Sequence, residues 1–290
     1  MAAEVQADLH CHTTASDGLF APGDVVRLAA RIGLRAVGIT DHDTIAGWEE
    51  AETAGETTGV EIVRGIELST EWRGRDVHIL GYEPAGGSAL LRERLASLRL
   101  GREERIKKIV DRLSRLGIPI EPEEVFGVAT GESVGRPHVA QILMARGYAG
   151  SIGEAFERYL GRGAPGYVPR PKLTPEEGID LIRATGGVAV LAHPGVGGLA
   201  GRIPFWVSAG LQGVEVYHSE HTAAEEKTLS KIARDLNLIM TGGSDFHGEE
   251  RKPGAKIGGW GVSMAVVRQI KETARTGEGS RCTAKRCGPG

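Results

Sequence analysis

Histidines and carboxylic acids recur at the ends of short apolar segments in this chain, and no other feature restricts its fold as strongly. The segments are four to eight residues long, the usual length of a β-strand. Strands are expected at residues 5–9, 36–40, 61–68, 77–82, 188–192, 213–217 and 238–241. The histidines and acids at or near their ends are His10, His12, Asp17, His42, Glu67, His78, His193, Asp245 and His247. One such histidine would usually be an ordinary surface or core residue, but scattered residues would not follow this pattern.

Helical patterns alternate with these strands, at residues 22–32, 44–54 and 223–236 and in a segment that opens with Thr174 as N-cap. This order favours an α/β fold with parallel strands in a barrel or an open sheet. Because the carboxyl ends of parallel strands share one face of a barrel, the residues beyond them should meet there. His78 fits less well, because it lies near the start of its strand.

Between residues 86 and 163 the alternation stops. A long, arginine-rich helical pattern covers residues 89–116, and shorter ones follow at 122–125, 137–146 and 152–160. We therefore expect a barrel made from residues 1–85 and 164–276, with residues 86–163 as a helical insertion beside its mouth. The Gly-rich segment 277–290 is expected to be a disordered tail.

Composition excludes several classes of protein. The net charge of −3 gives no basic footprint for a protein that coats nucleic acid, and every apolar run is too short to span a bilayer. No signal peptide is visible at the N-terminus, and Cys11 stands far from the other two cysteines, so a cytoplasmic location is expected. Cys11 alternates with His10 and His12 along its strand and should therefore point into the core.

The residue types predict a metal centre. Imidazole and carboxylate together suit Zn²⁺, Mn²⁺ or Fe²⁺, and two neighbouring cations need a bridging acid such as Glu67. Residues two apart on a strand, such as His10 and His12, lie on the same face. Cations at such a site would activate water and attract phosphate, so no Ser or Cys nucleophile is required. Glu67, Asp245 and His193 are the predicted catalytic residues.

The motifs that carry these residues resemble those of the polymerase and histidinol phosphatase (PHP) family. They are Asp8-Leu9-His10-Cys11-His12, Ser16-Asp17-Gly18, residues 39–44, Gly65-Ile66-Glu67, Ala192-His193-Pro194 and Gly243-Ser244-Asp245-Phe246-His247. The resemblance implies a distorted (βα)7 barrel around two or three divalent cations. By motif, the first cation would be held by His10, His12, Glu67 and Asp245, the second by Glu67, His78 and His193, and the third by Asp17, His42 and His247.

The insertion resembles that of the bacterial branch of this family that acts on nucleotides. The matching residues are Gly135-Arg136-Pro137-His138, residues 159–163 and Tyr167-Val168-Pro169. The resemblance implies a phosphoesterase that removes the 3′-phosphate from nucleoside 3′,5′-bisphosphates, with short RNA degraded from its 5′ end as a further activity. A histidinol-phosphate or broad small-molecule phosphatase is the first alternative, and a non-catalytic metal-binding regulatory module is the second. No obligate protein partner and no membrane association are expected.

Substrate-binding candidates follow from charge and position. Arg136 suits a substrate phosphate because guanidinium binds phosphate through two hydrogen bonds. Arg102 and Arg105 are weaker candidates, because charged helix residues usually form a solvated face. His138 and His221 are expected near the mouth, and His218 at the surface. Two interpretations stay open for the acids beside His42: Asp41 and Asp43 orient imidazoles, or Asp43 caps the helix that follows.

Overall fold

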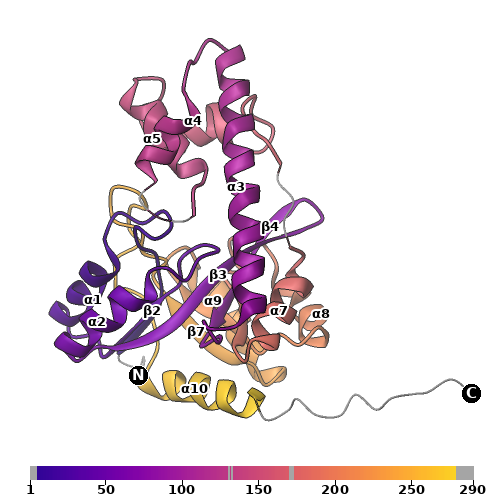
Figure 1. Cartoon of the computed structure of the whole chain (residues 1–290). Helices are drawn as coiled ribbons and strands as arrows, with labels where there is room; N and C mark the ends of the chain where they lie inside the picture. Colours follow the sequence, from indigo (N-terminus) through magenta and orange to yellow (C-terminus); the bar gives the residue numbers. More distant parts are fainter. Residues whose placement is uncertain (1–4, 130, 132, 170–172, 279–290) are drawn as a thin grey trace, which may run out of the picture.

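The computed structural model describes residues 5–129, 131, 133–169 and 173–278 (Figure 1). Its strands form one seven-stranded sheet in chain order. They are β1 (Ala7–Cys11), β2 (Ala36–Ile39), β3 (Glu61–Trp72), β4 (Arg75–Tyr82), β5 (Val188–Leu191), β6 (Gly213–His218) and β7 (Ile239–Gly243). Beyond the ends of β1 and β7, the amide of His12 donates to the carbonyl of Phe246 at 2.9 Å, which nearly closes the sheet into a barrel. The α/β barrel expected from the sequence is confirmed.

Backbones approach closely where the barrel closes. A Cβ on Gly243 would lie 2.4 Å from the Cβ of His10, so only glycine fits at the end of β7. Gly18 is restricted in the same way, because its Cβ would lie 2.5 Å from the carbonyl oxygen of His12. These two glycines hold the segments carrying Asp17 and Asp245 against β1.

Strand β4 departs from the parallel arrangement expected from the sequence. It pairs antiparallel with both β3 and β5, while the other neighbouring pairs are parallel. The reason is local: only Arg73 and Gly74 separate β3 from β4, and both have positive φ, as a two-residue hairpin turn requires. Because β4 runs in the opposite direction, His78 near its start lies at the same end of the barrel as the carboxyl ends of the other strands. The position that fitted the sequence pattern poorly is thereby explained.

Helices cover the outside of the barrel (Figure 1). They are α1 (Pro22–Arg31), α2 (Trp48–Thr58), α7 (Pro175–Ala184), the 3₁₀ turn η2 (Ala200–Arg202), α8 (Ile203–Ser208), α9 (Ala223–Asp235) and α10 (Met264–Glu278). Thr174 caps α7 as expected, with its side chain accepting from the amide of Glu177. Helix α2 begins at Trp48 with Gly47 as N-cap, so the interpretation of Asp43 as a helix cap is wrong.

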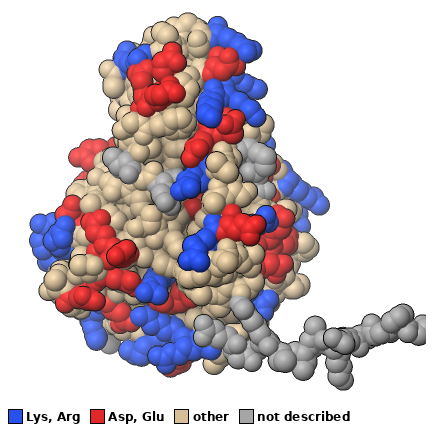
Figure 2. Space-filling model, viewed as in Figure 1, with Lys and Arg blue, Asp and Glu red and all other residues tan. Residues whose placement is uncertain are grey.

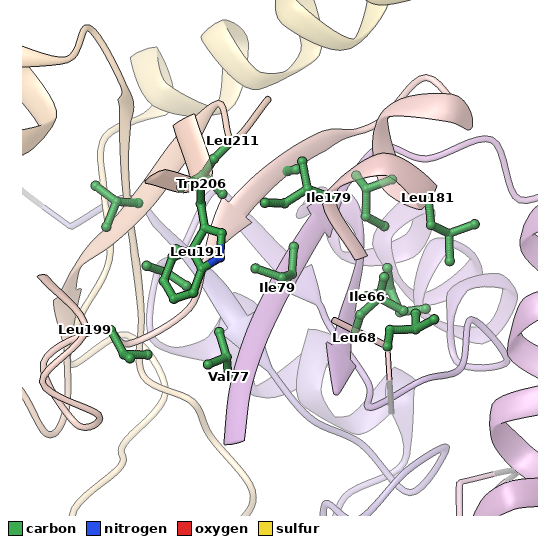
Figure 3. Close-up of a cluster of buried hydrophobic side chains, with 14 of the residues drawn as sticks. Ile66, Leu68, Val77, Ile79, Ile179, Leu181, Leu191, Leu199, Trp206 and Leu211 are labelled. Atoms are coloured by element: carbon green, nitrogen blue, oxygen red, sulfur yellow. The ribbon is translucent and has the colours of Figure 1, made fainter. Parts of the chain in front are cut away.

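The main apolar core lies between strands β3 to β6 and helices α7 to α9 (Figure 3). Trp206 is its largest fully buried side chain, and its indole nitrogen donates to Glu176 at 3.2 Å. Cys11 is also fully buried, in a second cluster beneath α1 and α2, as its alternation with two histidines predicts. Residues 279–290 of the expected tail lie outside the described part of the chain, and Gly277 and Glu278 end α10.

Residues 89–160 form a helical lobe above the barrel (Figure 1). Its helices are α3 (Ala89–Arg115), α4 (Pro122–Val128), α5 (Arg136–Ala145), α6 (Ile152–Ala155) and the π-helix η1 (Phe156–Leu160). Leu91, Leu95 and Leu98 of α3 pack into the barrel core, whereas the second half of α3 packs into a separate core of the lobe. Helix α3 therefore joins the two cores. The boundaries at residues 86 and 163 stay a prediction. Within the described ranges, no helix combines the length and apolar character that crossing a membrane requires.

Candidate metal centre

The nine histidines and acids singled out in the sequence gather at one end of the barrel. Ligand atoms within 4.8 Å of one another form five overlapping groups among the described residues, and three of these groups consist only of the nine. These three groups are His10–His12–Glu67–Asp245, His12–Asp17–His42–His247 and His42–Glu67–His78. His193 joins them through its Nε2, which lies 3.0 Å from Oε1 of Glu67.

Glu67 stands at the centre, and its two carboxylate oxygens face different histidines. Oε2 lies 3.1–3.2 Å from nitrogen atoms of His10, His12 and His42. Oε1 lies 2.7 Å from Nδ1 of His78 and 3.0 Å from Nε2 of His193. A buried carboxylate that faces two groups of imidazoles in this way has the arrangement of a bridging ligand.

The spacing of these atoms fits divalent cations. Ligand atoms bound at about 2.1 Å to one tetrahedral or octahedral cation lie roughly 3.0–3.4 Å apart. Nε2 of His10 and Nε2 of His12 lie 3.2 Å apart, and Oδ1 of Asp245 lies 3.5 and 3.2 Å from them. Among the described residues, Nδ1 of His12 and Oδ1 of Asp245 are buried without a hydrogen-bond partner. Buried polar atoms are normally satisfied, so unpartnered ones in a cluster of ligand atoms suit a cation.

The electrostatics of the cluster favour positive charge. Burial alone would raise the pKa of Glu67, but the surrounding histidines outweigh burial and hold that pKa well below its usual range. The pKa of Asp245 is depressed in the same way, with His10 and Lys252 opposing burial. Burial would lower the pKa of His12, but Asp245 and Glu67 raise it to about 10. The field that holds a proton on this imidazole also attracts a metal ion.

Backbone strain is present at the same place. His193 and Asp245 have φ values of 26° and 54°, in the left-handed region that non-glycine residues rarely adopt. Asp43, next to His42, has a φ of 54°. Strained residues persist where the surrounding structure holds them, and they gather at functional sites.

Glu215 supports this cluster and was missed in the sequence. It is fully buried, accepts from Nδ1 of His10 at 2.9 Å and accepts from the amide of His193 at 2.8 Å. The bond from Nδ1 of His10 to Glu215 orients the ring so that Nε2 faces Glu67. Burial opposes ionisation of Glu215, but His10 and His218 lower its pKa to about 2. An acid in the middle of the apolar strand β6 was the available signal.

His218 corrects another expectation. It was expected at the surface but is fully buried, with Nε2 3.5 Å from Oδ2 of Asp245. It ends β6, so it follows the rule that singled out the other nine residues. Lys252 was also missed, and nothing in the sequence marks it. Its ammonium lies 2.5 Å from Oδ2 of Asp245 and 2.7 Å from Oε2 of Glu220.

Asp41 and Asp43, the acids on either side of His42, accept hydrogen bonds from backbone amides and so hold backbone segments in place. Asp41 accepts from the amide and hydroxyl of Thr13, both at 2.8 Å, and from the hydroxyl of Ser16 at 2.6 Å. It thereby shapes the segment that carries Asp17. Asp43 accepts from the amide of Ser69 at 2.8 Å.

Arg102 is already engaged with protein groups. Its guanidinium lies 2.5 Å from Oδ2 of Asp43, donates to the hydroxyl of Ser69 at 3.0 Å and to the carbonyl of Val134 at 3.3 Å. This geometry gives Arg102 a structural role that joins α3 to the loop carrying His42, and its expected contact with substrate stays a prediction.

His221 also has a structural position. Its Nδ1 donates to the carbonyl of Val216 at 2.8 Å, and its Nε2 accepts from the amide of Gly195 at 3.0 Å. Both nitrogens therefore hold backbone groups, and they fix the turn that follows His193. This arrangement leaves no ring nitrogen for the substrate contact expected from the sequence.

Three arginines surround the ring of Tyr167 at the lobe's base. The guanidinium carbons of Arg105, Arg136 and Arg162 lie 5.6, 5.8 and 5.9 Å from its centroid. Arg136 also lies 3.5 Å from Asp76, which is two residues before His78 on β4 and on the same face. This arginine cluster therefore stands beside the His78 side of the centre. Elsewhere on the face seen in Figure 2, basic and acidic side chains are mixed.

His138 lies near the opposite side of the centre. It is buried, and Nδ1 accepts from the amide of Gly135 at 3.0 Å, so its hydrogen is on Nε2. Burial lowers the pKa of His138 to about 4, although the nearby charge of Asp17 opposes that shift. A neutral imidazole at this position is a hydrogen-bond donor rather than a cation.

Comparisons with known proteins agree with this geometry. A family model described as PHP domain matches residues 8–100. A 5′-3′ exoribonuclease of Haemophilus influenzae is 36% identical over 83% of this chain and 89% of its own length. A 3′,5′-nucleoside bisphosphate phosphatase of Chromobacterium violaceum is 32% identical, over 83% of this chain and 86% of its own. A phosphoribosyl 1,2-cyclic phosphate 1,2-diphosphodiesterase of Eggerthella lenta is also 32% identical, over 83% and 94%.

A solved structure from Bifidobacterium adolescentis, assigned as a metal-dependent phosphoesterase, superposes with a TM-score of 0.86 at 32% identity. The superposed region includes 92% of this chain and 96% of the Bifidobacterium chain. Barrel, cluster and relatives together define a metal-dependent phosphoesterase, a hydrolase of phosphate esters. The chain belongs to the PHP family.

Proposed function

We propose that this enzyme hydrolyses phosphate monoesters of nucleotides and that its preferred reaction removes the 3′-phosphate of a nucleoside 3′,5′-bisphosphate. Short RNA, degraded from its 5′ end, is the second substrate class. In the first reaction a water oxygen bonds to phosphorus, the bond between phosphorus and the 3′ oxygen breaks, and that oxygen takes up a proton. The products are inorganic phosphate and a nucleoside 5′-monophosphate.

The residues proposed to hold the cations are His10, His12, Asp17, His42, Glu67, His78, His193, Asp245 and His247. Two or three divalent cations, Mn²⁺, Zn²⁺ or Fe²⁺, would supply activated water and stabilise the charge on the phosphate oxygens. Glu67 would bridge two of them through oxygens that already face different histidines. Asp245 would bind through Oδ1, because Lys252 holds Oδ2. The orientation of His10 is set by Glu215.

The observation that carries the substrate proposal is the arginine cluster beside His78. A phosphate held at the cations leaves a second phosphate of the same small molecule within reach of Arg136, Arg105 or Arg162. Guanidinium groups bind phosphate well and repel a cationic amine, so histidinol phosphate should be a poor substrate. Two of the relatives named above are an exoribonuclease and a nucleoside bisphosphate phosphatase, which supports the nucleotide class.

The test is hydrolysis of a panel of substrates with Mn²⁺, Zn²⁺ or Fe²⁺, followed as phosphate release for the monoesters, as release of nucleoside 5′-monophosphates for the RNA and as ring opening for the cyclic phosphate. The panel contains adenosine 3′,5′-bisphosphate, histidinol phosphate, a short 5′-phosphorylated RNA and phosphoribosyl 1,2-cyclic phosphate. The last compound is included because it is the substrate in the name of the Eggerthella relative. We expect kcat/KM for the bisphosphate to exceed that for histidinol phosphate by at least ~10²-fold, about 2.7 kcal/mol. Phosphorus NMR should identify a 5′-monophosphate product. Equal or faster turnover of histidinol phosphate, or of the cyclic phosphate, would replace this proposal.

A further inference from the structure

A cavity of about 400 Å³ lies between helix α5, Ile152 and two loops of the barrel. One of these loops brings Leu19, and the other brings Glu250 and Arg251. The volume lies within the ~300–1,000 Å³ typical of small-molecule sites. Leu19, Met144 and Ile152 form its apolar part, and Leu19 and Met144 are each 37% exposed.

Two residues of the cavity wall hydrogen-bond to the backbone of residues in the cluster of histidines and acids. The amide of Leu19 donates to the carbonyl of His247 at 2.9 Å. The guanidinium of Arg251 donates to the backbone carbonyl of Asp17. The cavity therefore adjoins the side of the centre formed by Asp17 and His247, whereas the arginine cluster adjoins the His78 side.

Helix α5 contributes to both sides, because Arg136 contacts Asp76, and Gln141 and Met144 line the cavity. Arg136 begins this helix, and His138, Gln141 and Met144 follow at three-residue spacing, so that each is a surface neighbour of the next. Gln141 and Met144 line the cavity, while His138 stands close enough to Asp17 to feel its charge.

Gln141 lines the cavity, and a turn of its side-chain amide would bring a polar edge to a ligand there. Its Oε1 is buried and has no hydrogen-bond partner among the residues that the structure describes. An unsatisfied amide oxygen costs free energy unless a bound ligand supplies a donor. An apolar wall, a guanidinium plane and one amide edge are the groups with which proteins bind nucleobases, by packing on the ring and hydrogen bonding at its edge.

We propose that this cavity binds the nucleobase of the substrate and makes the enzyme prefer nucleotides over other phosphate esters. The proposal rests on the function proposed above, because it places the phosphate at the cations. In a nucleotide a single ribose joins phosphate and base, and the cavity begins at residues bonded to Asp17 and His247. The occupant is a purine or pyrimidine ring packed between Leu19, Met144 and Arg251, with its edge toward Gln141.

Kinetics with two substrates form the first test. Adenosine 3′,5′-bisphosphate is compared with 1-O-methylribose 3,5-bisphosphate, which has both phosphates and no base. The variant Met144→Glu should lower kcat/KM for the adenosine substrate at least ~10-fold more than for the base-free substrate, mainly through KM. Leu116→Glu, at an exposed position after the end of α3, is the matched control and should leave both values unchanged. Equal losses on both substrates in Met144→Glu would overturn the proposal.

Methyl NMR of the zinc-loaded enzyme tests binding without turnover. The chain has four methionines, and Met240 lines a rival cavity of about 610 Å³ with Trp260 and Tyr217. With ¹³C-methyl methionine, adenosine 5′-monophosphate should shift the Met144 signal by the ring current of its base, and ribose 5-phosphate should not. A shift of Met240 instead, or of neither methyl, would overturn the proposal.

The two proposals can fail separately. If the wild-type enzyme hydrolyses neither bisphosphate, the proposed function is wrong, and the NMR experiment still decides whether the cavity takes a base. If it hydrolyses both bisphosphates equally and Met144 does not shift, the base subsite is wrong and the phosphatase activity stands.

Discussion

At the scale of single residues, the centre depends on carboxylates whose two oxygens contact different groups. Glu67 turns one oxygen toward His10, His12 and His42 and the other toward His78 and His193. Glu215 turns one oxygen to a ring nitrogen of His10 and the other to the amide of His193. Each acid therefore fixes two groups relative to each other, and removal of its charge should affect both.

Glu215→Gln should weaken metal binding by about 10–100-fold, the usual effect of changing a group that orients a metal-bound histidine. The amide would compete with Nδ1 of His10 as a donor and disturb the tautomer that presents Nε2. Isothermal titration of metal into stripped protein measures the affinity. Glu272→Gln, on the exposed face of α10, is the control. Unchanged affinity in Glu215→Gln would show that this acid only supports the fold.

At the scale of elements, the reversed strand β4 shows what sequence periodicity can and cannot predict. Strand positions followed from apolar runs, because burial of the barrel interior requires them. Direction did not follow, because it depends on a turn of two residues, Arg73 and Gly74, and not on the strand itself. His78 was still chosen correctly as a residue of the cluster, since residue type identified it where position did not. Whether it binds metal stays a prediction.

Helix α5 gives the arginine prediction. Arg136→Ala should reduce kcat/KM more for nucleoside 3′,5′-bisphosphates than for an aryl phosphate. The difference should correspond to roughly 1.5–3 kcal/mol of transition-state binding free energy, the usual value of one charge-assisted contact. Arg146→Ala, at the other end of the helix, removes an exposed ion pair with Glu124 and should affect neither substrate selectively. If Arg136→Ala lowers both activities equally, Arg136 acts only through its contact with Asp76.

The same helix carries a pH-dependent part of the stability. The unfolded chain binds a proton at His138 near pH 6.5, whereas burial lowers the pKa in the folded protein to about 4. Between these values the unfolded state binds more protons, so the free energy of unfolding falls as the pH decreases. The His138→Gln variant has no titrating group at this position, so its free energy of unfolding should not fall for this reason. Urea unfolding should show the wild type losing stability relative to His138→Gln between pH 6.5 and 4, and parallel curves would contradict this.

At the scale of the whole molecule, Arg102 is a buried link between lobe and barrel, in addition to the contact of Arg136 with Asp76. Arg102 lies on α3, which packs into both cores, and its side chain is 11% exposed while that of Asp43 is fully buried. Sequence reasoning could not find this link, because an arginine on a long polar helix looks like any solvated residue. Lys252 was missed for a related reason, because its role depends on which loops meet, whereas Glu215 and His218 carried signals in strand β6 that were not used. Motif residues were found because several ligand types recur at strand ends.

Arg102→Met should destabilise the fold by roughly 3–5 kcal/mol, because one charge of a buried pair remains without its main partner. Urea unfolding measures the loss, and limited proteolysis should show faster cleavage within residues 89–160. The double variant Arg102→Met/Asp43→Asn should recover part of the stability, and asparagine tolerates the left-handed conformation of position 43. A single variant as stable as the wild type would contradict the linking role.

We propose that Glu67 bridges at least two catalytic cations. The direct measurement is phosphate release from adenosine 3′,5′-bisphosphate by metal-stripped protein as Mn²⁺ is added back, with bound metal determined in the same samples. We predict that activity appears only once at least two cations are bound per chain. Glu67→Gln should bind less metal and turn over at least ~10²-fold more slowly, while Glu61→Gln, an exposed acid on the same strand, should match the wild type. Full activity in the stripped protein, or wild-type turnover by metal-replete Glu67→Gln, would contradict the claim.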